Sequence, residues 1–460
     1  MSDATLSPVV IVGGGIAGLA VAYELTRLRV PFVLYEGDDR LGGVIRTERV
    51  DGFTIDLGPD SLLVQKPAAL ELCEELGLGS RLFPTQLPRT AFILRGGRLN
   101  PLPEASVLGI PTRLLPLATT RLFSPWGKLR MALDLAIPGA RSTDDESIAS
   151  FIGRRFGREA VTFLAEPLFA GIHSGDVDRL SMKALFPRML EAERRHGSLI
   201  RAFQKMPRGS GGDGAFRSLP DGLEELVRAV VGTLPHDSVV TGARVVAVER
   251  GSPFSVRLAS GTSVDASQVV LAVPAFAAAT IVQGLDGELA TACHEIPYAS
   301  TATVALAYPA RSVRHPLDGS GFVVPRAEPG CRLLAASWVS SKWPGRAPAD
   351  VVLLRAFLGG ARDPDVLREG DDALVRMSHD ALSRILGIGA EPLLTRLQRW
   401  PNANAQHEVG HLDRMDGIER RLRALPGLSV TGSGFRGVGI PDCIADGRAV
   451  ARSVAEAHAR

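Results

Sequence analysis

A cluster of glycines near the start of the chain is the first group of residues whose spacing could serve chemistry. Gly13, Gly15 and Gly18 fit G-x-G-x-x-G directly after the β-branched run Val9 to Val12. Glycines at this spacing let the backbone approach a pyrophosphate, and the following helix directs its N-terminal amides at the phosphates. Glu36 ends the next apolar run, where a carboxylate accepts hydrogen bonds from ribose hydroxyls. The acid would repel an extra phosphate on that ribose, so the motif disfavours NADP and leaves NAD and FAD open.

Two later turns favour FAD over NAD. Arg40, Gly42 and Gly43 follow the acid and offer a cation and bare amides to further phosphate. Gly58 to Ser61 makes another tight turn. A chain that returns to its cofactor this often suits a long cofactor, and we therefore expect FAD.

The elements that position these residues alternate between strand and helix. Segments 1–90, 211–290 and 396–460 hold the dinucleotide motif, apolar strands and the last helix, and we expect one discontinuous Rossmann-like FAD-binding domain from them. Segment 91–210 has a mostly helical pattern, and segment 291–395 has alternating strands whose sheet could floor a substrate cavity. The predicted fold class is α/β, or α+β overall, with an FAD-binding domain, a helical domain and a mixed-sheet substrate domain.

Composition and charge argue against several classes of protein. The 460 residues suffice for two or three domains, and a net charge of +2 gives no case for nucleic acid. Four scattered cysteines without C-x-x-C and nine histidines without H-E-x-x-H predict no metal site. The first apolar run lacks a basic flank, and no run reaches about 18 residues, so we expect a cytoplasmic protein. Ser106 to Ile137 forms short basic amphipathic pieces with Trp126, which fit either peripheral membrane contact or packing within the domain.

Motifs spread along the chain carry a specific resemblance. They are Glu166 to Ser181, Phe186 to Arg188, Glu191 to Ser198, Gly321 to Pro325, Ser340 to Pro348, Phe357 to Gly360, Arg399 to Pro401, Val409 to Leu412 and Arg436 to Ile444. In this order, over essentially the whole chain, the sequence resembles the oxygen-dependent porphyrinogen oxidases of the amine-oxidase-like flavoproteins. The resemblance implies non-covalent FAD and removal of six electrons from a porphyrinogen, with three molecules of oxygen leaving as hydrogen peroxide. It also implies an amine-oxidase-like fold and a helical domain that often touches a membrane. The oligomeric state that the family suggests is a homodimer.

The resemblance also implies roles for individual residues. Val323, Trp338 and Phe357 would sandwich the macrocycle, and Gly171 and Gly175 would let backbone approach it near the flavin. Ala91 stands where an arginine is common, so Arg89 becomes the candidate for a propionate. The residues implied to bind FAD are Gly13, Gly14, Gly15, Ala17, Gly18, Glu36, Gly37, Arg40, Gly42, Gly43, Gly58, Pro59, Asp60, Ser61, Val245, Trp400, Val438, Gly439 and Ile440. No catalytic side-chain acid or base is expected, because hydride loss to a flavin needs mainly placement.

Some positions depart from the family pattern and leave the substrate open. Asp60 stands where asparagine is common, and a carboxylate there would repel a propionate or alter the flavin potential; His173 replaces a tyrosine, and Ser433 and Gly434 replace Asn-Ala. Protoporphyrinogen IX is favoured over coproporphyrinogen III, because the slot residues are apolar and the latter has four propionates instead of two. An amine oxidase, a polyene desaturase and a porphyrin carrier without catalysis are the more distant alternatives.

Overall fold

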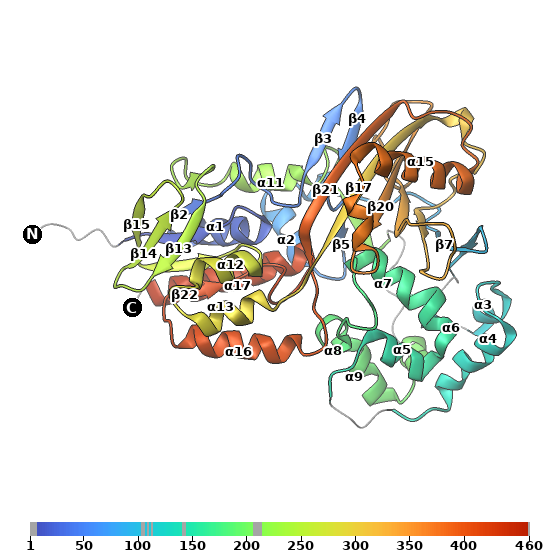
Figure 1. The fold of residues 1–460 in the computed structure, drawn as a ribbon, viewed down its shortest axis with the longest axis horizontal. Helices are drawn as coiled ribbons and strands as arrows, with labels where there is room; N and C mark the ends of the chain where they lie inside the picture. The colour runs from blue at the N-terminus through green and yellow to red at the C-terminus, as the bar shows by residue number, and fades with distance from the viewer. Residues whose placement is uncertain are drawn as a thin grey trace, which may run out of the picture.

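The first of two sheets carries the dinucleotide motif. The computed structural model describes residues 7–102, 106–107, 110–111, 114–139, 144–205 and 214–458. Five parallel strands in the order β12-β2-β1-β16-β22 form this sheet (Figure 1). They are β1 (Val9–Val12), β2 (Phe32–Tyr35), β12 (Val239–Val240), β16 (Gln268–Leu271) and β22 (Leu428–Val430). Strands distant in the chain thus lie side by side, and the short apolar runs suit a sheet buried on both faces.

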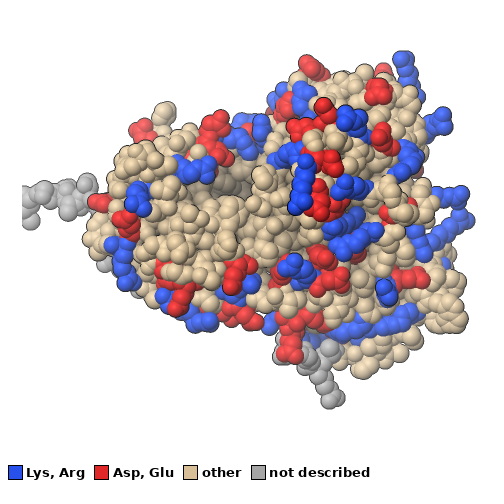
Figure 2. All heavy atoms as spheres, viewed as in Figure 1, with Lys and Arg blue, Asp and Glu red and all other residues tan. Residues whose placement is uncertain are grey.

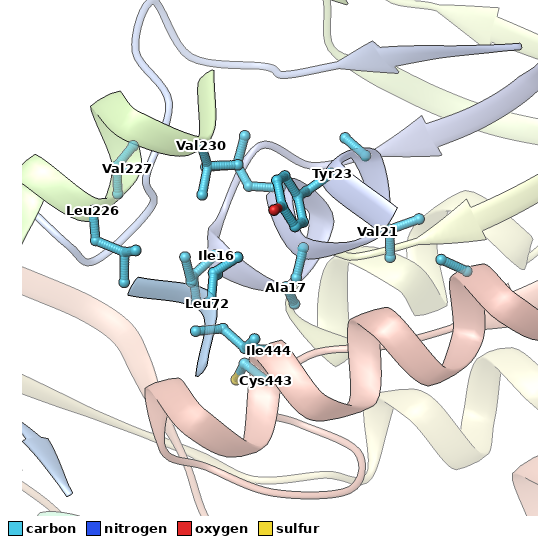
Figure 3. Close-up of a cluster of buried hydrophobic side chains, with 14 of the residues drawn as sticks. Ile16, Ala17, Val21, Tyr23, Leu72, Leu226, Val227, Val230, Cys443 and Ile444 are labelled. Carbon is cyan, nitrogen blue, oxygen red and sulfur yellow. The ribbon is translucent and has the colours of Figure 1, made fainter. Parts of the chain in front are cut away.

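Helices cover both faces of this sheet. One face packs on α1 (Ile16–Leu28), α2 (Ala68–Glu75), α11 (Glu224–Val231) and α17 (Ile440–His458). Figure 3 shows Ile16, Ala17 and Tyr23 of α1 in this core, with Ile444 of α17 nearby. The other face packs on α12 (Ala275–Val282), α13 (Gly287–His294), α16 (His411–Arg423) and the meander β13 (Val245–Glu249), β14 (Phe254–Leu258) and β15 (Ser263–Ala266).

A seven-stranded mixed sheet forms the second layer. Its order is β21-β17-β20-β19-β18-β7-β8, antiparallel except for the pair β18–β7. The strands are β7 (Ala91–Arg95), β8 (Arg98–Pro101), β17 (Tyr298–Pro309), β18 (Gly321–Val323), β19 (Ala335–Trp338), β20 (Val351–Gly359) and β21 (Leu394–Ala405). Helix α15 (Asp371–Leu386) packs on one face.

The observed topology corrects two predicted domain boundaries. Strands β7 and β8 lie within the segment 91–210, which was expected to be helical, but they extend the second sheet. Strand β21 starts at Leu394 and pairs with β17, although segment 396–460 was assigned to the first domain. Both errors arise because long-range strand pairing assigns a strand to a sheet, and local pattern does not report it.

The remaining helices form a third lobe, at the lower right of Figure 1. Its elements are α3 (Leu114–Thr119), α4 (Pro125–Ala132), η2 (Leu133–Leu135), α5 (Ile148–Phe156), α6 (Arg158–Ala160), the π-helical turn η3 (Val161–Ala165), α7 (Glu166–His173), α8 (Met182–Leu185), α9 (Pro187–His196) and α10 (Leu199–Lys205). A buried ion pair holds it together, since Arg155 Nε donates to Asp134 Oδ1 at 2.6 Å.

Short elements connect the lobes. They are β3 (Thr47–Val50), β4 (Phe53–Asp56), β5 (Leu62–Leu63), η1 (Gly79–Arg81), β6 (Phe83–Pro84), β9 (Ser106–Val107), β10 (Ile110–Pro111), β11 (Phe216–Ser218), η5 (Ala310–Ser312), α14 (Val339–Lys342) and η6 (Pro364–Arg368). The predicted α/β class with mixed sheets is confirmed. In the part of the chain that the structure describes, no helix has the length and apolarity needed to cross a bilayer.

Candidate active site

The glycine turn after β1 has the geometry of a phosphate-binding loop. A Cβ on Gly18 would collide with the Gly13 carbonyl oxygen, so glycine lets α1 begin close against the strand. Gly13 itself has φ +107°, which L side chains rarely adopt. A Cβ on Gly15 would meet no described atom within 4 Å, and no side chain of a described residue caps the N-terminus of α1 there. Open space in front of uncapped amides fits an anionic oxygen.

Glu36 faces this turn from the end of β2. Its Oε2 accepts a hydrogen bond from Gly14 N at 2.6 Å and its Oε1 one from Asp38 N at 2.9 Å. Ala243 N donates to Glu36 O at 2.8 Å, which brings the start of β13 at Val245 close to the acid. The acid, Gly37 and the start of β13 thus lie close together. Figure 2 shows a hollow in the surface over the region where Figure 1 labels α1 and α11.

The turn after Glu36 also packs on the glycine loop. Gly42 N donates to Gly14 O at 2.8 Å, and a Cβ on Gly43 would lie 3.3 Å from Gly15 Cα. Arg40, however, already makes three hydrogen bonds within this turn. Its guanidinium donates to the carbonyls of Leu41 at 3.1 Å and Ile45 at 3.2 Å, and also to Gly43 O. Arg40 therefore holds the shape of this turn, and sequence alone did not show that its donors are used locally.

The turn at Gly58 lies beside the same loop and beside Trp400. A Cβ on Gly58 would collide with Val44 O and would lie 3.6 Å from the Trp400 ring. The Trp400 indole donates to Leu57 O at 3.0 Å, and Thr303 Oγ1 donates to the same oxygen at 2.8 Å. Two side chains of the second sheet therefore fix this turn against the first lobe.

The start of α17 provides a further approach of backbone to this region. Val438, Gly439 and Ile440 are half-buried, and Gly439 N donates to Asp442 Oδ2 at 3.2 Å. Pro59 and Ser61 are also half-buried, and Ala17 is buried with its carbonyl beside Gly447 of α17. Ala17 thus has a packing role between two helices.

Three of the predicted substrate residues meet at one face of the second sheet. Strand register puts Val323 opposite Ala335, and Ala335 opposite Phe357. A Cβ on Gly171 of α7 would lie 3.2 Å from Val323 Cγ1, so α7 covers this face closely. Val323, Phe357 and Gly171 are all half-buried. The structure therefore brings these three predicted residues together.

Trp338 lies on the opposite face of the sheet, away from the slot in which it is predicted. It is fully buried, with its ring 5.3 Å from that of Phe92 and 4.8 Å from that of His315. Side chains alternate along β19, so Trp338 shares the face of Ala336, which packs toward α15.

Two other predicted substrate residues have local explanations. A Cβ on Gly175 would collide with Gln406 Oε1, and Gln406 Nε2 donates to His173 O at 3.0 Å. Gly175 therefore packs closely against Gln406, the residue that follows β21. Arg89 Nε donates to Thr85 O at 2.9 Å, which uses one of its donors within its own segment.

A buried cluster of charges adjoins the Gly58 turn and was missed by the sequence analysis. Asp60 accepts from Lys342 Nζ at 3.0 and 3.1 Å and from Trp343 Nε1 at 3.3 Å, and it pairs with Arg355 at 3.1 Å. Burial would raise the pKa of Asp60, but Lys342 and Arg355 hold it well below its usual range. The signal that could have found this cluster is the arginine within the apolar run Val351 to Phe357.

The expected repulsion by Asp60 is therefore not what the geometry supports. Its charge is matched by two cations, and Arg355 also donates to Gly58 O at 2.7 Å and lies 4.8 Å from the Phe357 ring centre. Asp60 and Arg355 together tie the turn to the substrate face.

Three histidines lie between the lobes. His407 and His411 stack with ring centres 3.8 Å apart, and their Nε2 atoms lie 3.0 Å from Ser433 O and 2.8 Å from Phe435 O. Burial and the neighbouring His411 lower the pKa of His407 to about 3. Burial and the charge of Lys66 lower the pKa of His173 to about 4, so His173 is neutral near pH 7.

Comparison with known proteins identifies the family. The model of the flavin-containing amine oxidoreductase family matches residues 16–455. The chain belongs to this family. The coproporphyrinogen III oxidase of Bacillus subtilis (strain 168) is 37% identical over 458 residues, covering 96% of each chain. The chloroplastic protoporphyrinogen oxidase of Nicotiana tabacum is 28% identical over 474 residues, covering 97% of this chain and 85% of that protein.

A solved structure extends the same result to the fold. A crystal structure of a protoporphyrinogen oxidase candidate from Exiguobacterium sp. 255-15 has a TM-score of 0.89 and 32% identity, covering 99% of this chain and 100% of that chain. This member of the flavin-containing amine oxidoreductases is an oxidoreductase with a flavin cofactor. The open, uncapped start of α1 and the acid at Glu36 fit the phosphate and ribose portions of such a cofactor.

Proposed function

We propose that this flavoprotein binds FAD non-covalently and oxidises coproporphyrinogen III to coproporphyrin III in heme biosynthesis. The observation that carries the proposal is that the Gly58 turn connects the glycine turn after β1 with the second sheet, one face of which is apolar. The choice of substrate follows the 37% identity to a coproporphyrinogen III oxidase, against 28% for a plant protoporphyrinogen oxidase. This reverses the preference for protoporphyrinogen IX that the apolar slot residues favoured.

The FAD assignment rests on the residues that could hold the cofactor. Gly15 and the start of α1 would receive the pyrophosphate, Glu36 the ribose, and backbone at Val245 the adenine. Non-covalent binding is supported by Cys443, the cysteine in α17. Burial raises the pKa of its thiol to about 12, and the thiol donates to Gly437 O, so a thiolate for attachment is not available.

The chain's part in the reaction is placement. A flavin held by these residues would supply the acceptor for hydride from a meso carbon of the porphyrinogen, with molecular oxygen as the final electron acceptor that leaves as peroxide. Val323 and Phe357 would hold the macrocycle on the sheet face, with Gly171 allowing α7 to cover it. Removal of six electrons to three molecules of oxygen gives three molecules of hydrogen peroxide. His173, neutral near pH 7, adds no charge beside the region.

Turnover of the two porphyrinogens tests the proposal. Protein reconstituted with FAD is given coproporphyrinogen III or protoporphyrinogen IX under air, and porphyrin fluorescence and peroxide are followed together. We expect kcat/KM for coproporphyrinogen III to be at least about tenfold higher, a difference of about 1.4 kcal/mol in transition-state binding. A tenfold preference for protoporphyrinogen IX would overturn the substrate choice. No oxidation above the spontaneous rate with FAD bound would overturn the enzyme assignment.

We also propose that the protein is cytoplasmic and touches a membrane surface through α4. Trp126, Leu129 and Leu133 follow one another at helical spacing and are 79%, 54% and 46% exposed. Apolar side chains at this spacing on a surface helix, one of them a tryptophan, suit the interface of a bilayer. The rest of the predicted segment 106–137 lies partly outside the described residues. Cosedimentation with anionic vesicles tests the contact, and a homodimer remains a prediction.

A further inference from the structure

The buried charge cluster beside the Gly58 turn carries more positive than negative charge. Its cations are Lys342, Arg346 and Arg355, and its anions are Asp56 and Asp60. All five residues are buried or nearly so, with side chains between 1% and 15% exposed. Among the described residues, Arg355 Nε and two guanidinium nitrogens of Arg346 have no hydrogen-bond partner. A buried excess of one positive charge is costly, and an anion that reaches the cluster would be stabilised.

Lys342 is the cation through which an outside anion could reach the cluster. Its side chain is 15% exposed, against 5% for Arg355 and 1% for Arg346. Its Nζ is hydrogen-bonded to the two Asp60 oxygens, and the described residues offer this ammonium no other acceptor. Nζ also lies 5.9 Å from the ring centre of Phe216, a residue that is 41% exposed. An ammonium group has three donors, so one remains for a ligand.

The surroundings of Lys342 indicate the chemistry of that ligand. Arg355 lies against Phe357, and Asp60 joins Arg355 to Lys342, so the ammonium stands at the edge of the apolar sheet face. Gln86 N donates to Lys342 O at 3.0 Å, which places the segment ending at Arg89 alongside. A ligand that fits both features has a flat apolar body with carboxylates at its rim.

We propose that Lys342 binds a propionate carboxylate of the substrate and is a specificity-determining residue of this enzyme. The assignment rests on the proposed porphyrinogen oxidation. Asp60 orients the lysine by accepting two of its hydrogen bonds. Arg355 pairs with the same carboxylate, so Asp60 alone does not balance the two positive charges beside it. Asp60 in the Gly58 turn therefore connects Lys342 to Arg355, which lies on the apolar face of the second sheet.

A comparison of how the protein binds a porphyrin acid and its ester distinguishes carboxylate binding by Lys342 from a purely structural role of this residue. The holoenzyme is titrated with coproporphyrin III and with its tetramethyl ester, which has the same ring and no carboxylates. Lys342→Met balances the cluster at two cations and two anions, so the variant should fold. We expect it to bind the acid about tenfold more weakly and the ester as the wild type does. KM for coproporphyrinogen III should rise in the same ratio while kcat stays within about twofold.

Two further variants complete the design. Lys342→Arg keeps the charge and should bind the acid within about threefold of the wild type. Lys183→Met removes an exposed lysine of α8 and should change neither titration. Equal loss of acid and ester binding in Lys342→Met, or no loss of either, would overturn the assignment. Wild-type protein that binds neither porphyrin and oxidises no porphyrinogen would overturn the proposed function together with it.

Discussion

The stacked pair His407 and His411 should make the protein sensitive to mild acid. Both rings are almost fully buried, at 3% and 1% exposure, and their centres are 3.8 Å apart. Burial lowers the pKa of both, and the proximity of His411 lowers that of His407 further, to about 3. The folded chain therefore keeps His407 neutral at a pH where the unfolded chain protonates it, and burial shifts the pKa of His411 in the same direction.

The sign and size of the effect follow from linkage. A base whose pKa is depressed by folding contributes its full stability above the unfolded pKa, about 6.5, and loses it as the pH falls toward the folded pKa. Between pH 7 and pH 5.5 a histidine that titrates only in the unfolded chain, as expected for His407, lowers the free energy of unfolding by about 1.3 kcal/mol. His411 contributes in the same direction. Protonating both rings in place is disfavoured, because two positive charges would then lie within one stack.

Urea unfolding at pH 7 and pH 5.5 measures this dependence. His407→Gln should reduce the difference in unfolding free energy between the two pH values by about 1.3 kcal/mol, since the imidazole with the depressed pKa is no longer present. His236→Gln, at a fully exposed histidine, is the matched control and should leave the difference unchanged. A His407→Gln variant that keeps the whole wild-type pH dependence would show that the His407 ring is already protonated or solvated in the folded protein.

Three other perturbations follow from the same structure. Asp60→Asn leaves Lys342 and Arg355 without their buried partner and should cost about 3 kcal/mol or more in unfolding free energy, measured by urea titration; an unchanged midpoint would mean that water already reaches these cations. Gly18→Ala puts a methyl group onto the Gly13 carbonyl oxygen and should abolish flavin retention, read from the visible spectrum of the purified protein; full flavin content would contradict the close packing. Trp126→Ser with Leu129→Ser should lower cosedimentation with anionic vesicles at least severalfold, and equal cosedimentation would exclude α4 as the contact.

The first lobe was the part of the fold most accessible from sequence. The run Val9 to Val12, the glycines and Glu36 are local in the chain, and each has one stereochemical reason to be there. The second sheet was less accessible, because β7 and β21 join it through pairings between distant segments. The sequence of a short strand between two turns does not specify which other strand it will pair with.

Charged side chains were the least predictable part of the site. Arg40 is predicted to offer a cation to phosphate, and in the structure three of its hydrogen bonds go to carbonyls of its own turn. Asp60 was interpreted as a repulsive group, but Lys342 and Arg355 match its charge from segments about 280 and 295 residues away. The effect of a charge depends on partners that only the tertiary structure brings near.

Trp338 and Phe357 show why a strand motif can name the right sheet and the wrong face. Both belong to neighbouring strands, and both were assigned to one slot. In the observed register Ala335 is opposite Phe357, while Trp338, three residues further along β19, is opposite Leu354 on the other face. A shift of one residue in that register would exchange the two faces of β19 and put Trp338 into the slot. The pairing of β19 with β20 therefore decides which side chains line the slot. Aromatic residues in these strands can be assigned to the slot only once that pairing is known.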